Sequence, residues 1–254
     1  MSLAPTLAPS LAPSLALACD GVRVRYGGIE VLHGVRLSLA YGTFSALVGP
    51  NGAGKTTLLD WLAGVTSEAS SGSAASGSAA FPAFPASPAS PASSAAVEGR
   101  LELNGRQDAA HWPVARRAAS GLRYVPFERN VFPGLSVLDN LRACGATAAA
   151  AFSSFPELEA LSSRSAGVLS GGERQLLAVA SALFGRGSIL LLDEPTHGLA
   201  PALVDRVLAE LARSARSDGR AVLIAEPQPD RVADHADFLW PLDRGARLHP
   251  ATGA

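Results

Sequence analysis

The stretch GPNGAGKT, residues 49–56, decides the fold of this chain. It follows the apolar run FSALV (44–48) and leads into TTLLDWLAG (56–64), whose helical pattern stops at Gly64. A strand, a Gly-rich turn and a helix in this order predict a loop whose backbone N–H groups surround phosphate groups at the positive end of a helix. A Gly-rich turn with a purely structural role is the alternative, and the flanking strand and helix disfavour it.

Further along the chain, helical and strand patterns alternate. Apolar residues recur at helical spacing in ERQLLAVASALFG (173–185) and in PALVDRVLAELARSARSDG (201–219). Each of these helices is followed by a short apolar run, ILLLD (189–193) after the first and AVLIA (221–225) after the second. This alternation predicts an α/β fold with a parallel sheet that is covered by helices on both faces.

Three other segments show strands that are joined by tight turns. VRVRYGGIEVLHGVRLSLAYG (22–42) and GRLELNGR (99–106) predict short strands in a small antiparallel sheet beside the parallel core. Near the end, FLWPLDRGARLH (238–249) predicts a hairpin, with Pro241 at an edge because proline cannot donate a ladder hydrogen bond.

Three tracts are expected to lie outside the folded core. The first 18 residues repeat LAPT and LAPS with proline at every fourth position, and are expected to form a disordered tail. Residues 69–96 contain only Ala, Ser, Gly, Pro and Phe. This tract is expected to loop out at the surface, because it buries too little apolar area to offset its ordering entropy. With a short C-terminal tail at 248–254, the folded domain is expected to span 19–247 and to continue across the insertion.

Composition excludes several classes of function. The chain has 254 residues, a net charge of −1 and 17% charged residues, and it lacks a Lys/Arg run that could neutralise nucleic-acid phosphates. No nucleic-acid partner is therefore expected. No apolar run approaches the roughly 20 residues that span a bilayer, so any membrane association is expected to be peripheral. Cys19 and Cys144 lack the spacing of a zinc site or a disulfide framework, which fits a reducing compartment.

Acidic residues supply a second motif, ILLLDEP (189–195). It places Asp193 and Glu194 at the carboxyl end of a buried strand, where parallel sheets present ligands. We expect Asp193 to hold Mg²⁺ and Glu194 to orient or deprotonate an attacking water. In the phosphate loop, Lys55 is expected to reach the β- and γ-phosphates, and Thr56 to offer its hydroxyl to Mg²⁺. An Asp-Glu pair alone is often a helix cap, and its combination with the loop favours the catalytic interpretation.

The third motif is VLSGGERQ (168–175). Ser170 and Glu173 have the spacing of a helix capping box, which is a structural interpretation. Gly171 and Gly172 between them leave the backbone N–H groups of the helix start open to an anion such as a γ-phosphate. The two interpretations are compatible.

In this order, the phosphate loop, LSGGE and LLLDEP resemble the motifs of the ATP-binding cassette (ABC) family of ATPases. The resemblance covers about residues 19–247, apart from the insertion. It implies a P-loop NTPase fold with a parallel-sheet core, a small antiparallel β subdomain and an α-helical subdomain. It also implies hydrolysis of ATP with Mg²⁺ as cofactor. By motif position, the implied nucleotide contacts are Gly49, Asn51, Gly52, Ala53, Gly54, Lys55, Thr56, Thr57, Ser170, Gly171, Gly172 and Glu173.

The resemblance further implies partners. In this family the LSGG segment of one subunit closes on ATP held by the phosphate loop of another, so the implied working unit is a head-to-tail homodimer or heterodimer. NVFPGLSVLDNL (130–141) matches the region that faces integral-membrane permease subunits, although Ser136 and Asp139 there also fit a helix cap. A peripheral position on the cytoplasmic face of the cell membrane follows. Tyr26 matches the aromatic residue that stacks on adenine, and an exposed strand tyrosine is the alternative.

Short strings favour one branch of the family. The segment that begins with YVP (124–126), FPEL (155–158) and GLAP (198–201) resemble the ATPases of branched-chain amino-acid and urea or amide importers. The implied function is ATP hydrolysis that energises uptake of a small polar solute, such as branched-chain amino acids.

Two positions depart from the family pattern. After YVP the family commonly has Gln or Glu, which contacts Mg²⁺, but this chain has Phe127 and then Glu128. After VLIAE the family has His or Gln, which contacts the γ-phosphate, but this chain has Pro227 and then Gln228. Either Glu128 and Gln228 take over these contacts, or the chain is a partly degenerate, ATP-binding regulatory subunit with little turnover at its own site. His197, in the loop that touches the partner subunit, is not expected to replace either residue.

Overall fold

A seven-stranded sheet forms the centre of the computed structural model, which describes residues 14–66, 95–128, 130–247 and 251–252. Its strand order is β10-β8-β3-β7-β6-β5, with β9 paired to β8. The parallel strands are β3 (Phe44–Val48), β5 (Leu122–Val125), β6 (Ile189–Asp193), β7 (Ala221–Glu226) and β8 (Phe238–Asp243). Two short strands run antiparallel to β8, namely β9 (Ala246–Arg247) and β10 (Ala251–Thr252). The predicted parallel core and the hairpin between β8 and β9 are confirmed. The edge position expected for Pro241 is wrong, because β8 lies between β3 on one side and β9 and β10 on the other, and Pro241 itself is paired with Val48 of β3.

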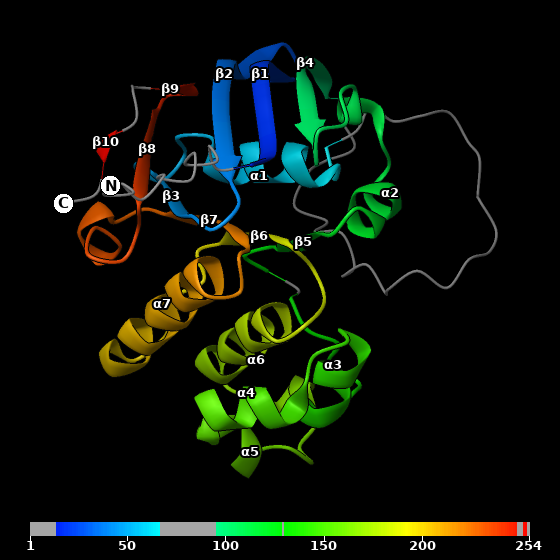
Figure 1. Cartoon of the computed structure of the whole chain (residues 1–254), viewed down its shortest axis with the longest axis vertical. Helices are drawn as coiled ribbons and strands as arrows, with labels where there is room; N and C mark the ends of the chain where they lie inside the picture. Colours follow the sequence, from blue (N-terminus) through cyan, green and yellow to red (C-terminus); the bar gives the residue numbers. More distant parts are fainter. Residues whose placement is uncertain (1–13, 67–94, 129, 248–250, 253–254) are drawn as a thin grey trace, which may run out of the picture.

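Helices cover both faces of this sheet (Figure 1). The helices next to it are α1 (Lys55–Ala63) on one face and α6 (Gly171–Leu183) and α7 (Pro201–Arg216) on the other. Every residue of β6 is buried, and its side chains alternate between two hydrophobic clusters. Leu190 and Leu192 pack with α6 and α7, whereas Ile189 and Leu191 pack with α1. Burial on both faces explains why this strand is apolar throughout.

A second, antiparallel sheet covers α1 from outside (Figure 1). Its strands are β1 (Leu15–Tyr26), β2 (Ile29–Ala40) and β4 (Ala96–Leu103), in the order β2-β1-β4. Leu17, Val24 and Leu37 point inward and join the hydrophobic cluster around α1. β1 and β2 have 12 residues each, so the expectation of short strands is wrong. The sheet is the predicted β subdomain.

Short helices beyond α6 form the α-helical subdomain (Figure 1). They are α3 (Val137–Ala143), α4 (Ala148–Ser154) and α5 (Pro156–Ala160). Ser136 caps α3 as predicted, because its hydroxyl oxygen accepts a hydrogen bond from the Asp139 N–H at 3.0 Å. The remaining short elements are η1 (Ala109–His111), α2 (Val114–Ala119), η2 (Ala166–Val168) and η3 (Pro229–Arg231). Among the described residues, no helix combines the length and the apolar character that crossing a membrane requires.

The expected domain boundaries need correction at three places. β1 begins at Leu15, and its residues Ala16 and Leu17 are fully buried, so the prediction of a disordered tail is wrong for 15–18. Ser14 is described as well, and its carbonyl accepts a hydrogen bond from the Tyr41 N–H at 2.9 Å, whereas residues 1–13 of that tail lie outside the described residues. The same holds for the insertion up to residue 94, whereas Ala95 is buried and β4 starts at the next residue. In the expected C-terminal tail, β10 pairs with β8. Strand pairing satisfies backbone groups at both ends of the domain, in residues 15–18 of β1 and in the two residues of β10.

Candidate functional site

The phosphate loop joins β3 to α1, and its backbone needs glycine at two positions. Gly54 caps α1 in a left-handed conformation with φ 97°, and a Cβ there would lie 2.8 Å from Leu32 Cδ2. Gly49 lies against the β8–β9 hairpin, where a Cβ would come within 2.1 Å of the carbonyl oxygen of Leu242. Because only glycine fits both places, the loop and the hairpin hold each other in one conformation.

The ammonium group of Lys55 lies inside this loop. Its Nζ donates hydrogen bonds to the carbonyl oxygens of Gly49 at 2.8 Å and Pro50 at 3.1 Å. An ammonium has three N–H donors, so a third can serve a phosphate oxygen. Burial lowers the pKa of Lys55, and the charges of three carboxyl groups oppose that shift: Glu194, Asp193 and Glu226. The predicted phosphate-binding cation therefore lies near the predicted acidic residues.

Thr56 and Asp193 meet as the sequence predicts. Thr56 Oγ1 donates a hydrogen bond to Asp193 Oδ2 at 2.7 Å. Asp193 is fully buried, and its Oδ1 accepts no hydrogen bond from any residue that the structure describes. Burial raises the pKa of Asp193 to about 6, and the hydrogen bond from Thr56 opposes that rise. A buried carboxylate oxygen without a partner costs free energy, which a ligand at this position would offset.

These two side chains fit magnesium. A hydroxyl oxygen and a carboxylate oxygen are ligands that Mg²⁺ prefers, and Mg²⁺ usually takes its other ligands from phosphates and water. In the described part of the chain, no group of three or more His, Cys, Asp and Glu side chains could hold a metal ion. Because Thr56 and Asp193 supply one oxygen each and Mg²⁺ prefers octahedral coordination, this donor pair suits an ion that takes further ligands from a nucleotide and water.

Glu194 directly follows β6 and has a strained backbone. Its φ of 46° is rare for residues other than glycine. The Glu194 N–H donates to the carbonyl of Ala225 at 2.9 Å, and its carbonyl accepts from Gln175 Nε2 at 3.1 Å. Asn130 Nδ2 in turn donates to Gln175 Oε1 at 2.8 Å, and both amides are buried. The Glu194 peptide is thus held from β7 and from α6. Sequence reasoning missed Gln175 and Asn130, since no local pattern shows that their amides reach β6.

Glu226 is a second buried acid at the site, besides Asp193. It was not predicted from the sequence to belong to the site. It ends β7 and is 1% exposed. Thr196 Oγ1 donates to Glu226 Oε2 at 2.6 Å, and Arg231 Nη1 lies 3.9 Å from its Oε1. Burial raises the pKa of Glu226. An acid directly after a buried apolar run is the signal in the sequence that could have found it.

The capping box at the start of α6 is confirmed. The Glu173 N–H donates to Ser170 Oγ at 3.3 Å, and the Ser170 N–H donates to Glu173 Oε2 at 2.7 Å. Gly171 is exposed, and the backbone of Gly172 lies so close to the Gly198 carbonyl that a Cβ would stand 2.8 Å from its oxygen. The segment therefore has a fixed shape and an exposed side that another molecule can reach.

The other predicted site residues are more dispersed. Tyr26 ends β1 and packs partly against the hydrophobic cluster around α1. Glu128 and Gln228 are exposed, and in the described part of the chain no hydrogen bond or ion pair joins either side chain to the phosphate loop. Of the remaining loop residues, Asn51 and Gly52 are exposed, Ala53 is buried and Thr57 is partly buried.

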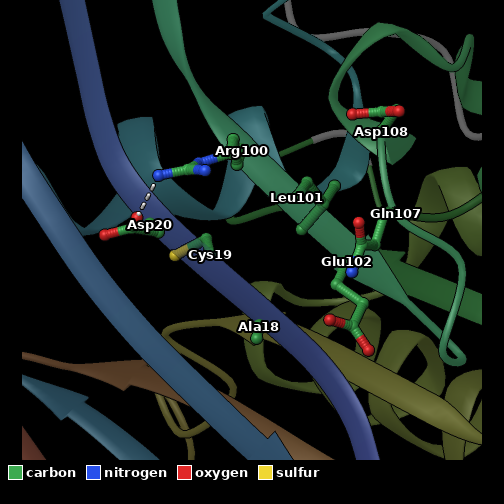
Figure 2. Close-up of a pocket in the computed structure, with 8 residues that line it drawn as sticks. All are labelled: Ala18, Cys19, Asp20, Arg100, Leu101, Glu102, Gln107 and Asp108. Carbon is green, nitrogen blue, oxygen red and sulfur yellow. Dashed lines mark hydrogen bonds and ion pairs between the residues drawn. The ribbon is translucent and has the colours of Figure 1, made fainter.

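A pocket of about 230 Å³ lies elsewhere, on the antiparallel sheet between β1 and β4 (Figure 2). Arg100 reaches from β4 to Asp20 on β1, with 3.1 Å between Nη2 and Oδ2 (Figure 2). Asp20 also pairs with Arg36 at 2.6 Å. Glu102 and Asp108 add negative charge to the lining. None of the predicted phosphate or metal ligands lies here, so the candidate functional site is the one around the phosphate loop.

Comparison with known proteins points to one family. The family model described as ABC transporter matches residues 32–197, which is more than half of the chain. The high-affinity branched-chain amino acid transport ATP-binding protein BraG of Pseudomonas aeruginosa is 32% identical over 247 residues, 94% of this chain and 93% of BraG. A probable branched-chain amino acid transport ATP-binding protein, LivF of Archaeoglobus fulgidus, is 30% identical over 229 residues, 87% of this chain and 85% of LivF.

Solved structures share the fold. A dimeric post-hydrolysis state of the ATP-binding cassette MJ0796, bound to ADP and Pi, superposes with a TM-score of 0.74 at 18% identity. That likeness covers 94% of this chain and 99% of the other. The ADP conformation of the cassette MJ1267 gives a TM-score of 0.69 at 22% identity, over 94% and 91% of the two chains. These neighbours confirm the predicted α/β P-loop NTPase fold. Because the matching family model spans the phosphate loop, the LSGGE segment (169–173) and the acids Asp193 and Glu194 at the end of β6, this chain belongs to the ABC transporter family.

Proposed function

We propose that this chain is the ATP-hydrolysing subunit of an ABC importer that takes up a small polar solute, with branched-chain amino acids as the favoured class. The observation that carries the proposal is the meeting of Lys55, Thr56, Asp193 and Glu194 at one edge of the parallel sheet. The names of BraG and LivF, which match this chain over most of their length, support the solute class.

The residues of this chain divide the work of hydrolysis. The loop N–H groups and the Lys55 ammonium bind the β- and γ-phosphates. Thr56 Oγ1 and Asp193 Oδ1 would hold Mg²⁺, which would supply positive charge to neutralise the phosphate oxygens. Glu194 accepts a proton from the attacking water as the water oxygen bonds to the γ-phosphorus and the bond to the β–γ bridging oxygen breaks. The fixed peptide of Glu194 limits where its carboxylate can lie.

A second ATPase chain completes the site in this proposal. The segment 170–173 of each chain, in which Ser170 and Gly171 are exposed, closes on the ATP held by the phosphate loop of the other, head to tail. The segment 130–141 binds a permease subunit at the cytoplasmic face of the membrane, where the chain is a peripheral protein. The exposure of Leu135, a large apolar side chain in that segment, supports a contact with another protein.

The two departures from the family pattern have proposed replacements. Glu128 reaches Mg²⁺ in place of Phe127, and Gln228 reaches the γ-phosphate in place of Pro227. Both polar side chains are exposed, which leaves them free to turn toward a bound nucleotide. Tyr26 stacks on the adenine ring, and its partly buried position at the end of β1 is compatible with this role.

The variant Glu194→Gln tests the proposed function. The amide keeps the shape of the side chain but cannot accept a proton, so hydrolysis should fall by about 10²- to 10⁴-fold. ATP affinity should change by less than about twofold, since Glu194 is not a phosphate ligand. The assay uses the chain purified with its membrane subunits. If the complex holds a second ATPase chain, the matching Glu of that chain is also changed to Gln, so that the remaining turnover belongs to this site.

The matched control is Glu98→Gln, which changes an exposed acid on β4 and should leave the rate unaltered. A regulatory subunit with little turnover of its own would give the same low rate with and without Glu194→Gln. That result would refute the proposal that this site hydrolyses ATP, but it would not contradict the proposal that the site binds ATP.

A further inference from the structure

Two side chains beside Glu194 have no part in the mechanism above. His197 Nδ1 lies 3.6 Å from Glu194 Oε2. The ring of Phe127 meets the His197 ring edge to face, with 4.9 Å between the ring centroids and 82° between the planes. The three side chains therefore form a continuous row, the Phe127–His197–Glu194 row.

The strand order of the sheet explains how this row forms. Phe127 lies in the loop after β5, and Glu194 and His197 lie in the turn after β6. β5 and β6 are adjacent and parallel, so their carboxyl ends lie at the same edge of the sheet. The His197 N–H donates to the Glu194 carbonyl at 3.1 Å, which closes a turn that keeps the imidazole beside the carboxylate.

The charges around the Glu194 carboxylate indicate how the His197 imidazole can affect its position. Lys55 attracts the Glu194 carboxylate, whereas Asp193 and Glu226 repel it. A carboxylate that turned onto the Lys55 ammonium would point away from an attacking water. A donor close to the carboxylate opposes that movement, and the Nδ1–H of His197, with Nδ1 3.6 Å from Oε2, is close enough to act as one after a small shift.

The aromatic ring gives the imidazole its support. The His197 side chain is 63% exposed, so the turn alone leaves its torsions open. An edge-to-face contact with Phe127 favours one ring orientation. Phe127 stands where the family commonly has a polar residue, and a polar side chain would not offer this face. Phe127 therefore removes the polar contact that the family commonly has at this position, and it supplies a ring contact to His197 instead.

We propose that His197 is a positioning residue for hydrolysis, which holds the Glu194 carboxylate toward the attacking water and is itself held by the Phe127 ring. The inference rests on the proposed role of Glu194 as the proton acceptor. It predicts an effect on the rate of turnover and little effect on ATP binding, because other residues are the proposed ligands of the phosphates.

The test compares substitutions of His197 in the assembled transporter, under the assay described for Glu194→Gln. His197→Ala should lower kcat by about tenfold, with the KM for ATP within about twofold. His197→Asn places an amide N–H near the position of Nδ1 and should restore kcat to within about threefold of the unmodified chain. A purely structural role of the turn would not distinguish the two variants in this way.

His33→Ala is the matched control. His33 Nδ1 lies 3.7 Å from Glu30 Oε1 at the same i, i+3 spacing, but on β2, and its acidic partner has no proposed role in hydrolysis. Its kcat should equal that of the unmodified chain. Phe127→Ala alone should lower kcat. When it is combined with His197→Ala, kcat should fall no further than in His197→Ala alone, because the two side chains act as one unit.

Two results would overturn the inference: a kcat for His197→Ala within twofold of His33→Ala, or equal losses for His197→Ala and His197→Asn. If Glu194→Gln abolishes turnover in the same assay, only the role of His197 is then refuted. If Glu194→Gln leaves turnover unchanged, the proposed function itself fails.

Discussion

Glu226 is a single residue at this site whose buried charge lowers the free energy of unfolding at neutral pH. Its carboxyl is buried at the end of β7, and burial raises its pKa above the ordinary value. A carboxyl with a raised pKa binds its proton more tightly in the folded chain than in the unfolded chain. The resulting stabilisation is complete below the unfolded pKa of about 4.3 and is lost as pH rises through the folded pKa.

The variant Glu226→Gln should therefore be more stable than the unmodified chain at pH 7 to 8. The amide has no charge to bury, and its oxygen can accept the hydrogen bond from Thr196. The difference in the free energy of unfolding should shrink as pH falls and vanish near pH 4. Urea denaturation at a series of pH values measures it, with Glu98→Gln on exposed β4 as the control. A lower stability of Glu226→Gln at every pH would contradict the burial argument.

Contacts that a shared chemical task requires could be predicted from the sequence, and contacts that depend only on packing could not. The pairing of Thr56 with Asp193 follows from two motifs whose shared task requires them to meet. The amide of Gln175 also stands in a quoted motif, but its contact with the Glu194 carbonyl depends on how α6 packs. The row from Phe127 to His197 likewise depends on the order of strands, which spacing along the chain does not encode.

At the scale of elements, the phosphate loop depends on the hairpin behind it. The Gly245 N–H donates to the Ala53 carbonyl at 3.0 Å, and Gly49 faces Leu242 in β8. Gly49→Ala should therefore destabilise the chain more than Gly52→Ala. Position 52 has φ 80° and nothing within 4 Å of an added Cβ, so only backbone strain of about 1 to 2 kcal/mol applies there. Thermal unfolding of the two variants measures the difference, and equal losses would show that the loop does not depend on the hairpin.

A buried arginine ties α1 to the segment before α2. The Arg117 guanidinium donates hydrogen bonds to four backbone carbonyls, those of Trp61, Leu62, Ala110 and Trp112. Two of them end α1, where a positive charge is favourable. Burial lowers the pKa of Arg117 to about 10, so it stays charged at neutral pH.

Arg117→Met should lower the free energy of unfolding by about 2 to 4 kcal/mol, because it leaves several buried carbonyls without donors. The neighbouring Arg116 is exposed and lies over the Trp112 ring at 4.0 Å. Arg116→Met should cost less than about 1 kcal/mol. Denaturant titration of both variants is the measurement, and similar losses would contradict the role of Arg117.

Periodicity predicted the long elements better than the short ones. The helices at 171–183 and 201–216 and the buried strands follow from their apolar spacing. The helices α4 and α5 have seven and five residues and were not predicted, since helices this short form only when tertiary packing holds them. The start of β1 was placed too late because the LAPS repeat obscures the strand that begins inside it.

At the scale of the whole molecule, the sheet brings distant motifs to one edge. β3 lies beside β7, and β7 lies beside β6, so the phosphate loop, Glu226 and Asp193 follow neighbouring strands. That strand order could be expected only from the resemblance to ABC ATPases. Ser170 and Gly171 at the start of α6 are exposed, as a site that is shared between two chains requires.

ATP should join two chains when hydrolysis is blocked. The variant Glu194→Gln with ATP and Mg²⁺ should form a dimer, with itself or with a second ATPase chain. Adding Gly171→Asp should prevent it, because a carboxylate at this position repels the γ-phosphate. An added Cβ at Gly171 meets nothing within 4 Å, and an acid in the first turn suits a helix, so the fold should persist. Light scattering measures the mass, and dimers of the double variant would contradict the shared site.

The most direct measurement of the central claim is solute uptake by proteoliposomes that contain the assembled transporter. Labelled leucine is supplied on the side of the membrane opposite this chain, and ATP with Mg²⁺ is supplied on the same side as this chain. Uptake should depend on ATP and should stop in Glu194→Gln, although that variant still binds ATP. Uptake that continues unchanged in Glu194→Gln would contradict the claim that hydrolysis at this chain's own site energises transport.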